Sequence, residues 1–548
     1  STGANTSTAA ATTNINATAT GAAAGAEAIA VKGGKDVTVV SKNNQADTID
    51  VGTLTGTVVS DAAAGKVSVT STGADVATGI TLGAITVNGG TEITVNQYAG
   101  KTAGAGNNTG GAVTVNGNAS TTTVTVNQTA TANGAAATTT TAAVVGYTAG
   151  TVTIADVNAG SATDAGTITT VTLKNYGNST IDSGALTTVN LEGTAGTLGI
   201  TAGALTTAKV DTLGLNLKGV VANAGGNAIT VDSVYKTLNV KSSTTASTIT
   251  ATNTDATAIN ISGDAALTLT VLNLGAAAGN EVITVTNTAG VTIGNALATD
   301  VTFTGGAGKD SVILTANYTK AINMGAGDDT VVYAAAGAGG SLNGGAGNDT
   351  LVVSANSAIA GLPEVSGFEV LKVKGASAVG GTTHNAHTFK ALEVGTNTVN
   401  TTFTNVAAGV GLTVLEANLG ITTTVTLANA TGTADVFNLT LKSDAAINAG
   451  TVALAGVETI NVNSVDTGSV TAAHVNDLVL TAADAKSIVV TGDAGVDFGA
   501  TALTKVTNFD ASAVTAGDVT FASANNTVGE LVTIKGGAGD DTLTGHAN

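Results

Sequence analysis

The feature that most constrains the fold is a glycine-rich hexad that recurs at nearly equal intervals in the middle of the chain. The hexads are GGAGKD, MGAGDD and GGAGND, at 305–310, 324–329 and 344–349. Each ends in an aspartate and leads into a short β-branched segment, and the aspartates are spaced by 329 − 310 = 19 and 349 − 329 = 20 residues. A fixed interval of this length is typical of a chain that coils, with each turn stacked on the last.

Short strand-like segments recur through much of the rest of the chain. ITVNGG at 85–90, VTVNGN at 113–118 and TVTVN at 123–127 alternate β-branched and polar residues and end in Gly or Asn. Short strands and single-glycine corners at intervals of roughly 18–25 residues predict an all-β fold, an elongated right-handed parallel β-solenoid. A series of immunoglobulin-like sandwiches is the alternative. Such domains usually carry Pro-rich linkers and a buried Trp or Tyr, whereas this chain has one Pro and no Trp.

The charge of the chain favours a cation as its partner. The formal net charge is −19, charged residues make up 10% of the sequence, and the basic residues are all Lys. A phosphate backbone or an anionic membrane surface would be repelled, so nucleic acid is not expected as a partner. The absence of Cys excludes disulfides and thiolate metal sites. No apolar run is long enough to predict a transmembrane segment.

The hexads match the pattern G-G-x-G-x-D-x-U-x, in which the loop binds calcium in an RTX-type parallel β-roll. Calcium takes six to eight oxygen ligands, and glycine lets successive main-chain carbonyls turn toward one point. A spacing of 19 and 20 residues stacks the hexad aspartates in one column. The sequence therefore predicts several Ca²⁺ ions held by Gly305, Gly306, Gly308, Asp310, Gly325, Gly327, Asp328, Asp329, Gly344, Gly345, Gly347, Asp349, and by a separate hexad at Gly536, Gly537, Gly539 and Asp541.

Two further aspartates are weaker candidates for calcium. Asp264 and Asp493 stand at predicted corners of the solenoid, in SGDA and TGDA, where capping of a turn is the alternative. Met324 replaces the first glycine of the second hexad. The segments between the hexads lack an aspartate at the position nine residues on, so a second row of sites on the opposite edge is not expected.

These patterns divide the chain into five expected segments. They are an irregular lead-in (1–30), a Thr/Val/Gly-rich β-solenoid (31–300), a calcium-binding β-roll segment (301–355), a continuation of the solenoid (356–535) and the start of a further hexad segment (536–548). The chain opens on Ser and stops just after the last hexad, so we expect it to be a fragment of a longer protein.

Enzymatic classes that share such hexads are not indicated. A metalloprotease needs H-E-x-x-H, and none of the four histidines stands in that setting. A lipase needs G-x-S-x-G, which the sequence does not contain. We therefore expect no catalytic activity.

Longer phrases around the hexads resemble a particular family. TLANATGTADVFNLTL (426–441), ALAGVETINV (453–462) and AKSIVVTG (485–492), together with the hexads, resemble the lattice-forming C-terminal part of RsaA-type bacterial surface-layer proteins. The likeness extends from about residue 110 to 548. It implies a secreted, extracellular protein that self-assembles through calcium, commonly as hexamers, into a two-dimensional crystalline coat on a Gram-negative cell. It also implies type I secretion and binding to lipopolysaccharide through a domain outside this sequence.

A calcium-dependent RTX adhesin is the alternative function. It would share the composition and the calcium sites. Adhesin arrays usually consist of near-identical domains of about 100 residues, whereas the repeats here are short and degenerate, which favours the surface layer.

Overall fold

The computed structural model describes 14 stretches of the chain. These are residues 5–20, 27–74, 79–99, 108–130, 147–205, 210–223, 226–274, 280–315, 318–333, 340–354, 365–377, 381–468, 474–499 and 503–546. The described residues contain strands and turns but no helix, and so no helix that could cross a bilayer. The chain divides into an N-terminal unit, Ser1–Asn295, and a C-terminal unit, Ala296–Asn548.

The N-terminal unit consists of two parallel sheets whose strands alternate along the chain. The first sheet contains β1 (Asn5–Ala9), β3 (Ala28–Gly33), β5 (Thr48–Val51), β9 (Ile85–Asn88), β12 (Val113–Asn116), β15 (Val152–Ala155), β17 (Ser179–Asp182), β19 (Leu198–Thr201), β21 (Ala228–Val231), β23 (Ser247–Thr252), β25 (Leu267–Asn273) and β27 (Val291–Leu297). The second sheet contains β2 (Ile15–Thr20), β4 (Val37–Asn44), β8 (Val67–Gly73), β10 (Glu92–Tyr98), β13 (Thr123–Thr129), β16 (Thr170–Tyr176), β18 (Thr188–Ala195), β20 (Thr212–Ala222), β22 (Thr237–Ser242), β24 (Ala258–Gly263) and β26 (Val282–Val285). Small pairs add β11 (Asn108–Thr109) with β14 (Tyr147–Thr148), and the antiparallel hairpin β6 (Thr53–Thr55) with β7 (Val58–Ser60).

The C-terminal unit repeats this plan. One sheet contains β29 (Ser311–Leu314), β31 (Thr330–Tyr333), β33 (Thr350–Val353), β35 (Val370–Val373), β37 (Ala391–Val394), β39 (Leu412–Val414), β41 (Val436–Ser443), β43 (Thr459–Asp466), β45 (Ser487–Gly492), β47 (Asn508–Val514) and β49 (Thr533–Lys535). The strands that alternate with them are β28 (Thr302–Thr304), β30 (Ile322–Asn323), β32 (Leu342–Asn343), β34 (Val365–Ser366), β36 (Thr382–Asn385), β38 (Thr401–Val406), β40 (Thr422–Leu427), β42 (Asn448–Leu454), β44 (Val475–Thr481), β46 (Gly495–Asp497), β48 (Val519–Ala522) and β50 (Thr542–Thr544).

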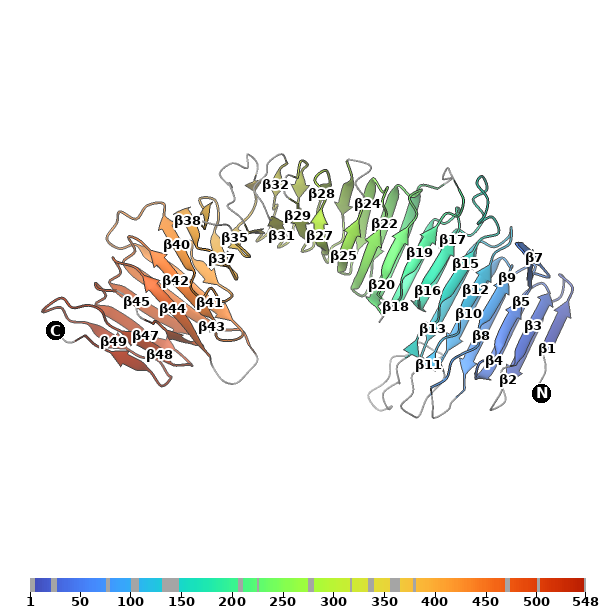
Figure 1. Ribbon diagram of the computed structural model, residues 1–548, viewed down its shortest axis with the longest axis horizontal. Helices are drawn as coiled ribbons and strands as arrows, with labels where there is room; N and C mark the ends of the chain where they lie inside the picture. Colours follow the sequence, from blue (N-terminus) through green and yellow to red (C-terminus); the bar gives the residue numbers. More distant parts are fainter. Residues whose placement is uncertain are drawn as a thin grey trace. The chain divides into compact units, whose positions relative to one another are not determined.

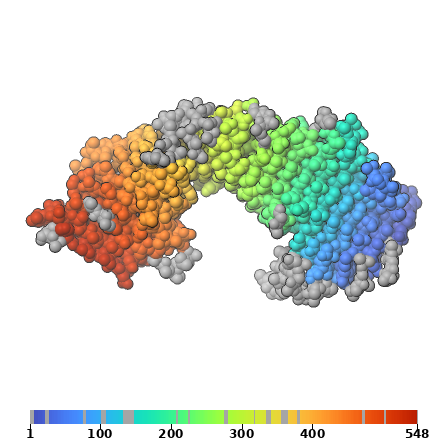
Figure 2. All heavy atoms as spheres, in the orientation of Figure 1, coloured from blue at the N-terminus to red at the C-terminus, as the bar shows by residue number. Residues whose placement is uncertain are grey.

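Within the large sheets, each strand pairs with the next strand of its own sheet along the chain, as expected for a coil. Within each unit the strands of one sheet lie side by side in sequence order (Figure 1), and the space-filling view shows successive colours as successive slices (Figure 2). Apart from the hairpin, every strand pair given for the described residues is parallel. The prediction of an all-β parallel β-solenoid is confirmed.

The core is a thin row of aliphatic side chains stacked from layer to layer. Strand residues alternate between the two faces, so one register column is buried throughout. Val31, Val51, Val87, Val115 and Ile154, each at most 1% exposed, follow one another in this way. Aromatic side chains join this core at a few layers, for example where Phe498, Phe509 and Phe521 pack together.

Residues 1–30 differ from the sequence expectation. We expected an irregular lead-in, but β1 and β2 fall within this segment and pair with β3 and β4. The expectation was wrong because Ala, Thr and Asn in alternation can line the pleated surface once the next coil provides a partner strand. The predicted division at 300/301 lies near the boundary of the two units at 295/296; the other predicted boundaries stay predictions.

Candidate metal centre

The three central hexads form successive layers of one corner in the C-terminal unit. They lead into β29, β31 and β33, which pair in register so that Ser311, Thr330 and Thr350 lie side by side. The preceding aspartates are therefore aligned, and we call Asp310, Asp329 and Asp349 the aspartate column. The sequence predicted this alignment from the spacing alone.

Main-chain amides link each member of the column to the next. The amide of Asp310 donates to Oδ1 of Asp329 at 2.7 Å, and the amide of Asp329 donates to Oδ1 of Asp349 at 2.8 Å. At the first layer, the amide of Gly306 donates to Oδ2 of Asp310 at 3.0 Å. Each carboxylate is thus held by the amide of another layer or of its own hexad, which fixes the direction of its second oxygen.

The glycines let the carbonyls of neighbouring layers approach closely. Gly345 has a φ of +105°, and a Cβ on it would overlap the carbonyl oxygen of Gly325. Any other residue would be strained and would clash with that oxygen. A Cβ on Gly305 would likewise meet Oδ2 of Asp310 and the carbonyl of Met324. The corner is therefore lined by main-chain oxygens at positions that only glycine leaves open.

Two oxygens of the column are buried and accept no hydrogen bond from a described residue. They are Oδ2 of Asp329 and Oδ2 of Asp349, in side chains that are 1% and 0% exposed. Burial raises the pKa of Asp329 to about 7, and the charges of Asp310, Asp349 and Asp328 add to the effect. Burial also raises the pKa of Asp349, with Glu369 and Asp328 contributing. The corner is thus short of positive charge and of hydrogen-bond donors.

A fourth layer that the sequence analysis did not assign to the site completes the column. The amide of Asp349 donates to Oε2 of Glu369 at 3.1 Å, and Lys390 Nζ lies 3.1 Å from Oε1 of the same residue. Burial acts to raise the pKa of Glu369, but the Asp349 amide and Lys390 outweigh it and hold this pKa below its usual value. The segment GFEVLKV at 367–373 contained a signal for this layer, since its glutamate stands one residue before a strand, as the hexad aspartates do.

The donor set fits a hard divalent cation. Carboxylate and carbonyl oxygens are the ligands that calcium prefers, and the two orphaned carboxylate oxygens lack a positive partner. No group of three or more His, Cys, Asp or Glu side chains suited to a metal occurs among the described residues. A cation at this corner would therefore take part of its ligands from the main-chain carbonyls of the hexads.

Asp328, predicted as a ligand, lies outside the column. Its side chain is exposed, and Oδ1 accepts a hydrogen bond from the amide of Asn348 at 2.9 Å. Met324 does not disturb the corner, because its side chain is fully buried and its carbonyl faces Gly305.

The hexad at 536–541 lies next to the layer that contains Asp518, a residue that the sequence analysis did not assign to this site. The pairing of Thr520 with Thr542 places Asp518 beside Asp540, whose amide donates to Oδ1 of Asp518 at 2.8 Å. Oδ1 of Asp541 accepts from the amide of Val519 at 2.9 Å, and Asp541 is only partly buried. This corner is more open than the aspartate column, and a trapped carboxylate oxygen is not found on Asp541.

Asp264 and Asp493 have the contacts expected of capping residues. Both are exposed, and each accepts one hydrogen bond from an amide one coil earlier, Thr244 at 2.9 Å and Asp466 at 2.8 Å. This geometry favours the capping alternative over calcium for the two weaker candidates.

Another corner of the C-terminal unit joins three polar side chains that are distant in sequence. Ser443 Oγ lies 3.4 Å from Nε2 of His474, and Nδ1 of His474 lies 3.4 Å from Oδ2 of Asp466. The order matches the serine hydrolase triad. Ser443 is 7% exposed, however, and the side chains of its two partners are 11% exposed, which leaves little room for a substrate carbonyl. We interpret the three residues as a polar link between the ends of β41 and β43 and the start of β44.

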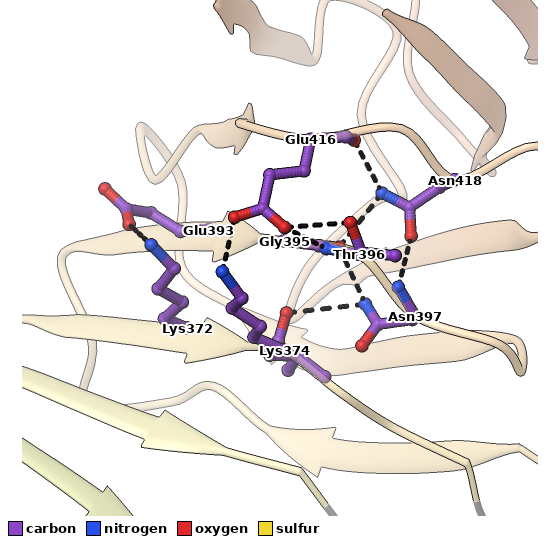
Figure 3. A network of polar contacts seen from close by, with 9 residues as sticks. Lys372, Lys374, Glu393, Gly395, Thr396, Asn397, Glu416 and Asn418 are labelled. Carbon is purple, nitrogen blue, oxygen red and sulfur yellow. Dashed lines mark hydrogen bonds and ion pairs between the residues drawn. The ribbon is translucent and has the colours of Figure 1, made fainter.

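A contrasting corner follows β35, β37 and β39 (Figure 3). Oε1 of Glu416 pairs with Lys374 Nζ, and Oε2 accepts from the amide and hydroxyl of Thr396 at 3.0 and 2.8 Å. Next to it the amide of Asn397 donates to Oδ1 of Asn418 at 3.0 Å. Asn397 and Asn418 are 5% and 1% exposed, and the chain itself provides their partners. We call these five residues the neutral corner.

Two comparisons with known proteins gave no match. No protein-family model matches this chain, and no curated protein is similar to it. The assignment of a function therefore depends on the geometry of the corners and on the sequence patterns.

Proposed function

We propose that this chain is a structural protein without a catalytic role, in which the aspartate column takes up calcium and so enables acidic copies to assemble. The observation that carries the proposal is the pair of orphaned oxygens, Oδ2 of Asp329 and Oδ2 of Asp349, buried in a row of stacked carboxylates. A buried charge without a partner is costly. The chain keeps two such unpartnered carboxylate oxygens in one corner.

The residues of the column are suited to a cation-dependent fold. The amide links fix the direction of each carboxylate, and the hexad glycines leave main-chain oxygens free to approach. Bound there, calcium would supply the positive charge that the corner lacks. Because this arrangement exists only when the layers are stacked, binding and folding are coupled. Extracellular calcium modules bind at about 10⁻⁴–10⁻³ M, so the fold would respond to the calcium outside a cell.

A self-assembling coat is the role that we propose for the whole molecule. A net charge of −19 opposes close packing of copies, and divalent cations reduce that repulsion. The resemblance to surface-layer proteins supports a secreted, extracellular lattice, built of hexamers, on a Gram-negative cell. Type I secretion and attachment to lipopolysaccharide through a domain outside this sequence belong to the same proposal. A calcium-dependent RTX adhesin is the second candidate, but continuous coils within each unit favour the coat.

Electron microscopy of the purified protein with and without calcium tests the proposal. We expect ordered sheets in millimolar calcium and dispersed particles after addition of a chelator. The variant Asp329→Asn should form sheets poorly in calcium, whereas the matched variant Asp264→Asn should behave as the parent. Sheets that persist in chelator would contradict the proposal, and so would equal behaviour of the two variants.

A further inference from the structure

We infer that Lys390 is the counter-ion that ends the aspartate column. Its ammonium neutralises the carboxylate of Glu369, one layer beyond the hexads, as a divalent cation would neutralise the aspartates within them. The inference rests on the proposed calcium role of the column. It adds that calcium is held by the three hexad layers and not by the layer of Glu369.

The register and the contacts place Lys390 at the end of the ladder. β33, β35 and β37 pair so that Thr350, Val370 and Ala391 lie side by side. The residues just before them, Asp349, Glu369 and Lys390, therefore continue the direction of the column. Oε2 of Glu369 receives the amide of Asp349, and Oε1 receives the ammonium of Lys390. Both oxygens of this carboxylate thus have a partner.

The Glu369 end of the column differs from the hexad layers in its charge balance. The side chain of Glu369 is 18% exposed, while that of Lys390 is 75% exposed. An exposed ammonium can therefore reach a largely buried carboxylate without being buried itself. Within the hexads, the charges that act on Asp329 are those of Asp310, Asp349 and Asp328, and all three are negative. A longer side chain, Glu in place of Asp, extends the carboxylate toward the lysine.

The same order of residues recurs elsewhere in the C-terminal unit without a glycine hexad. The amide of Asp435 donates to Oε2 of Glu458 at 2.9 Å, and the register of β41, β43 and β45 places Lys486 beside Glu458. At two corners, therefore, Asp, Glu and Lys occupy equivalent positions in three successive layers, and the amide of the Asp donates to the carboxylate of the Glu. At the Glu369 corner an ion pair with the lysine accompanies this order, whereas at the Glu458 corner the register alone places the two residues together.

Thermal unfolding of the full chain tests the inference. The variant Lys390→Gln removes the ammonium, and Lys372→Gln is the matched control, because Lys372 pairs with Glu393 at 3.5 Å on the same two strands without touching the column. In chelator we expect Lys390→Gln to lower the Tm of the C-terminal unit by a few degrees and clearly more than the control. Addition of calcium should raise the Tm of Lys390→Gln more than it raises that of the parent or of the control, because calcium can then serve the fourth layer.

Two further variants keep the result decisive. Lys390→Arg retains the charge and should behave as the parent, and the double variant Glu369→Gln/Lys390→Gln should recover stability in chelator. Equal effects of Lys390→Gln and Lys372→Gln in chelator would overturn the inference, as would an equal gain from calcium. If calcium leaves the parent unchanged, the proposed function fails. In that case a deficit of Lys390→Gln in chelator would still show that Lys390 balances the end of the row.

Discussion

Two corners of the C-terminal unit bury polar groups in stacked layers, but they differ in whether the chain itself supplies a partner for each buried carboxylate oxygen. The aspartate column precedes its strands and leaves two buried carboxylate oxygens without a partner. The neutral corner follows its strands, and Lys374, Thr396, Asn397 and the amides around them satisfy Glu416 and Asn418 (Figure 3). In the neutral corner the chain's own donors satisfy the buried carboxylate, whereas the aspartate column leaves two carboxylate oxygens for which a cation from outside is the partner that we propose. On that proposal only the column responds to calcium in the medium.

Removal of calcium should produce the largest difference in stability between the two corners. At a calcium concentration about 100 times the Kd, each bound ion stabilises the fold by about 2.7 kcal/mol. Chelation should therefore raise amide hydrogen exchange around 305–353 strongly, while exchange around 372–418 should change little. Mass spectrometry of exchanged peptides measures this difference. Equal loss of protection at both corners would mean that the column has no special need of a cation.

The pH dependence in chelator should distinguish the corners further. The folded pKa of Asp329 is raised to about 7, above its unfolded value near 4, so between these values the folded state binds more protons than the unfolded state. Stability without calcium should therefore rise as the pH falls from about 7 toward 4, by about 1 kcal/mol after allowance for relaxation of the corner.

Calcium should remove this pH dependence, because a bound cation favours the ionised carboxylate. Urea unfolding at several pH values, with and without calcium, measures both curves. A calcium-free stability that falls from pH 7 to pH 5 would contradict the assignment. The variant Asp329→Asn is the control and should show the weaker pH dependence.

Glu416→Gln in the neutral corner should have the smallest effect. The lysine and the Thr396 donors lower the pKa of Glu416 to about 2, so its contribution to stability is present above pH 4.5 and is lost as the pH falls toward 2. The side chain is 35% exposed, and screening by solvent limits the expected loss to about 0.5 kcal/mol. The loss should be the same with and without calcium; a loss confined to either condition would remove the distinction between the corners.

Much of the architecture followed from the sequence. Alternation of β-branched and polar residues with glycine corners predicted the parallel coil, and the intervals between the hexads predicted that Asp310, Asp329 and Asp349 are aligned. Both depend on local regularities, the period of a strand and the length of one coil, which the sequence carries directly.

The balance of charge at each corner was decided by the tertiary structure. Glu369 and Lys390 continue the column at nearly the interval of the hexads, 369 − 349 = 20 and 390 − 369 = 21, but their contacts do not follow from that interval. The exposure of Asp328 and the position of Asp518 beside the last hexad were likewise not evident from the sequence. The register between strands 19 to 22 residues apart sets these contacts. It becomes definite only when consecutive coils pack their buried faces against one another. The sequence by itself thus determined that acids would stack, and only the stacking decided which of them lack a counter-ion.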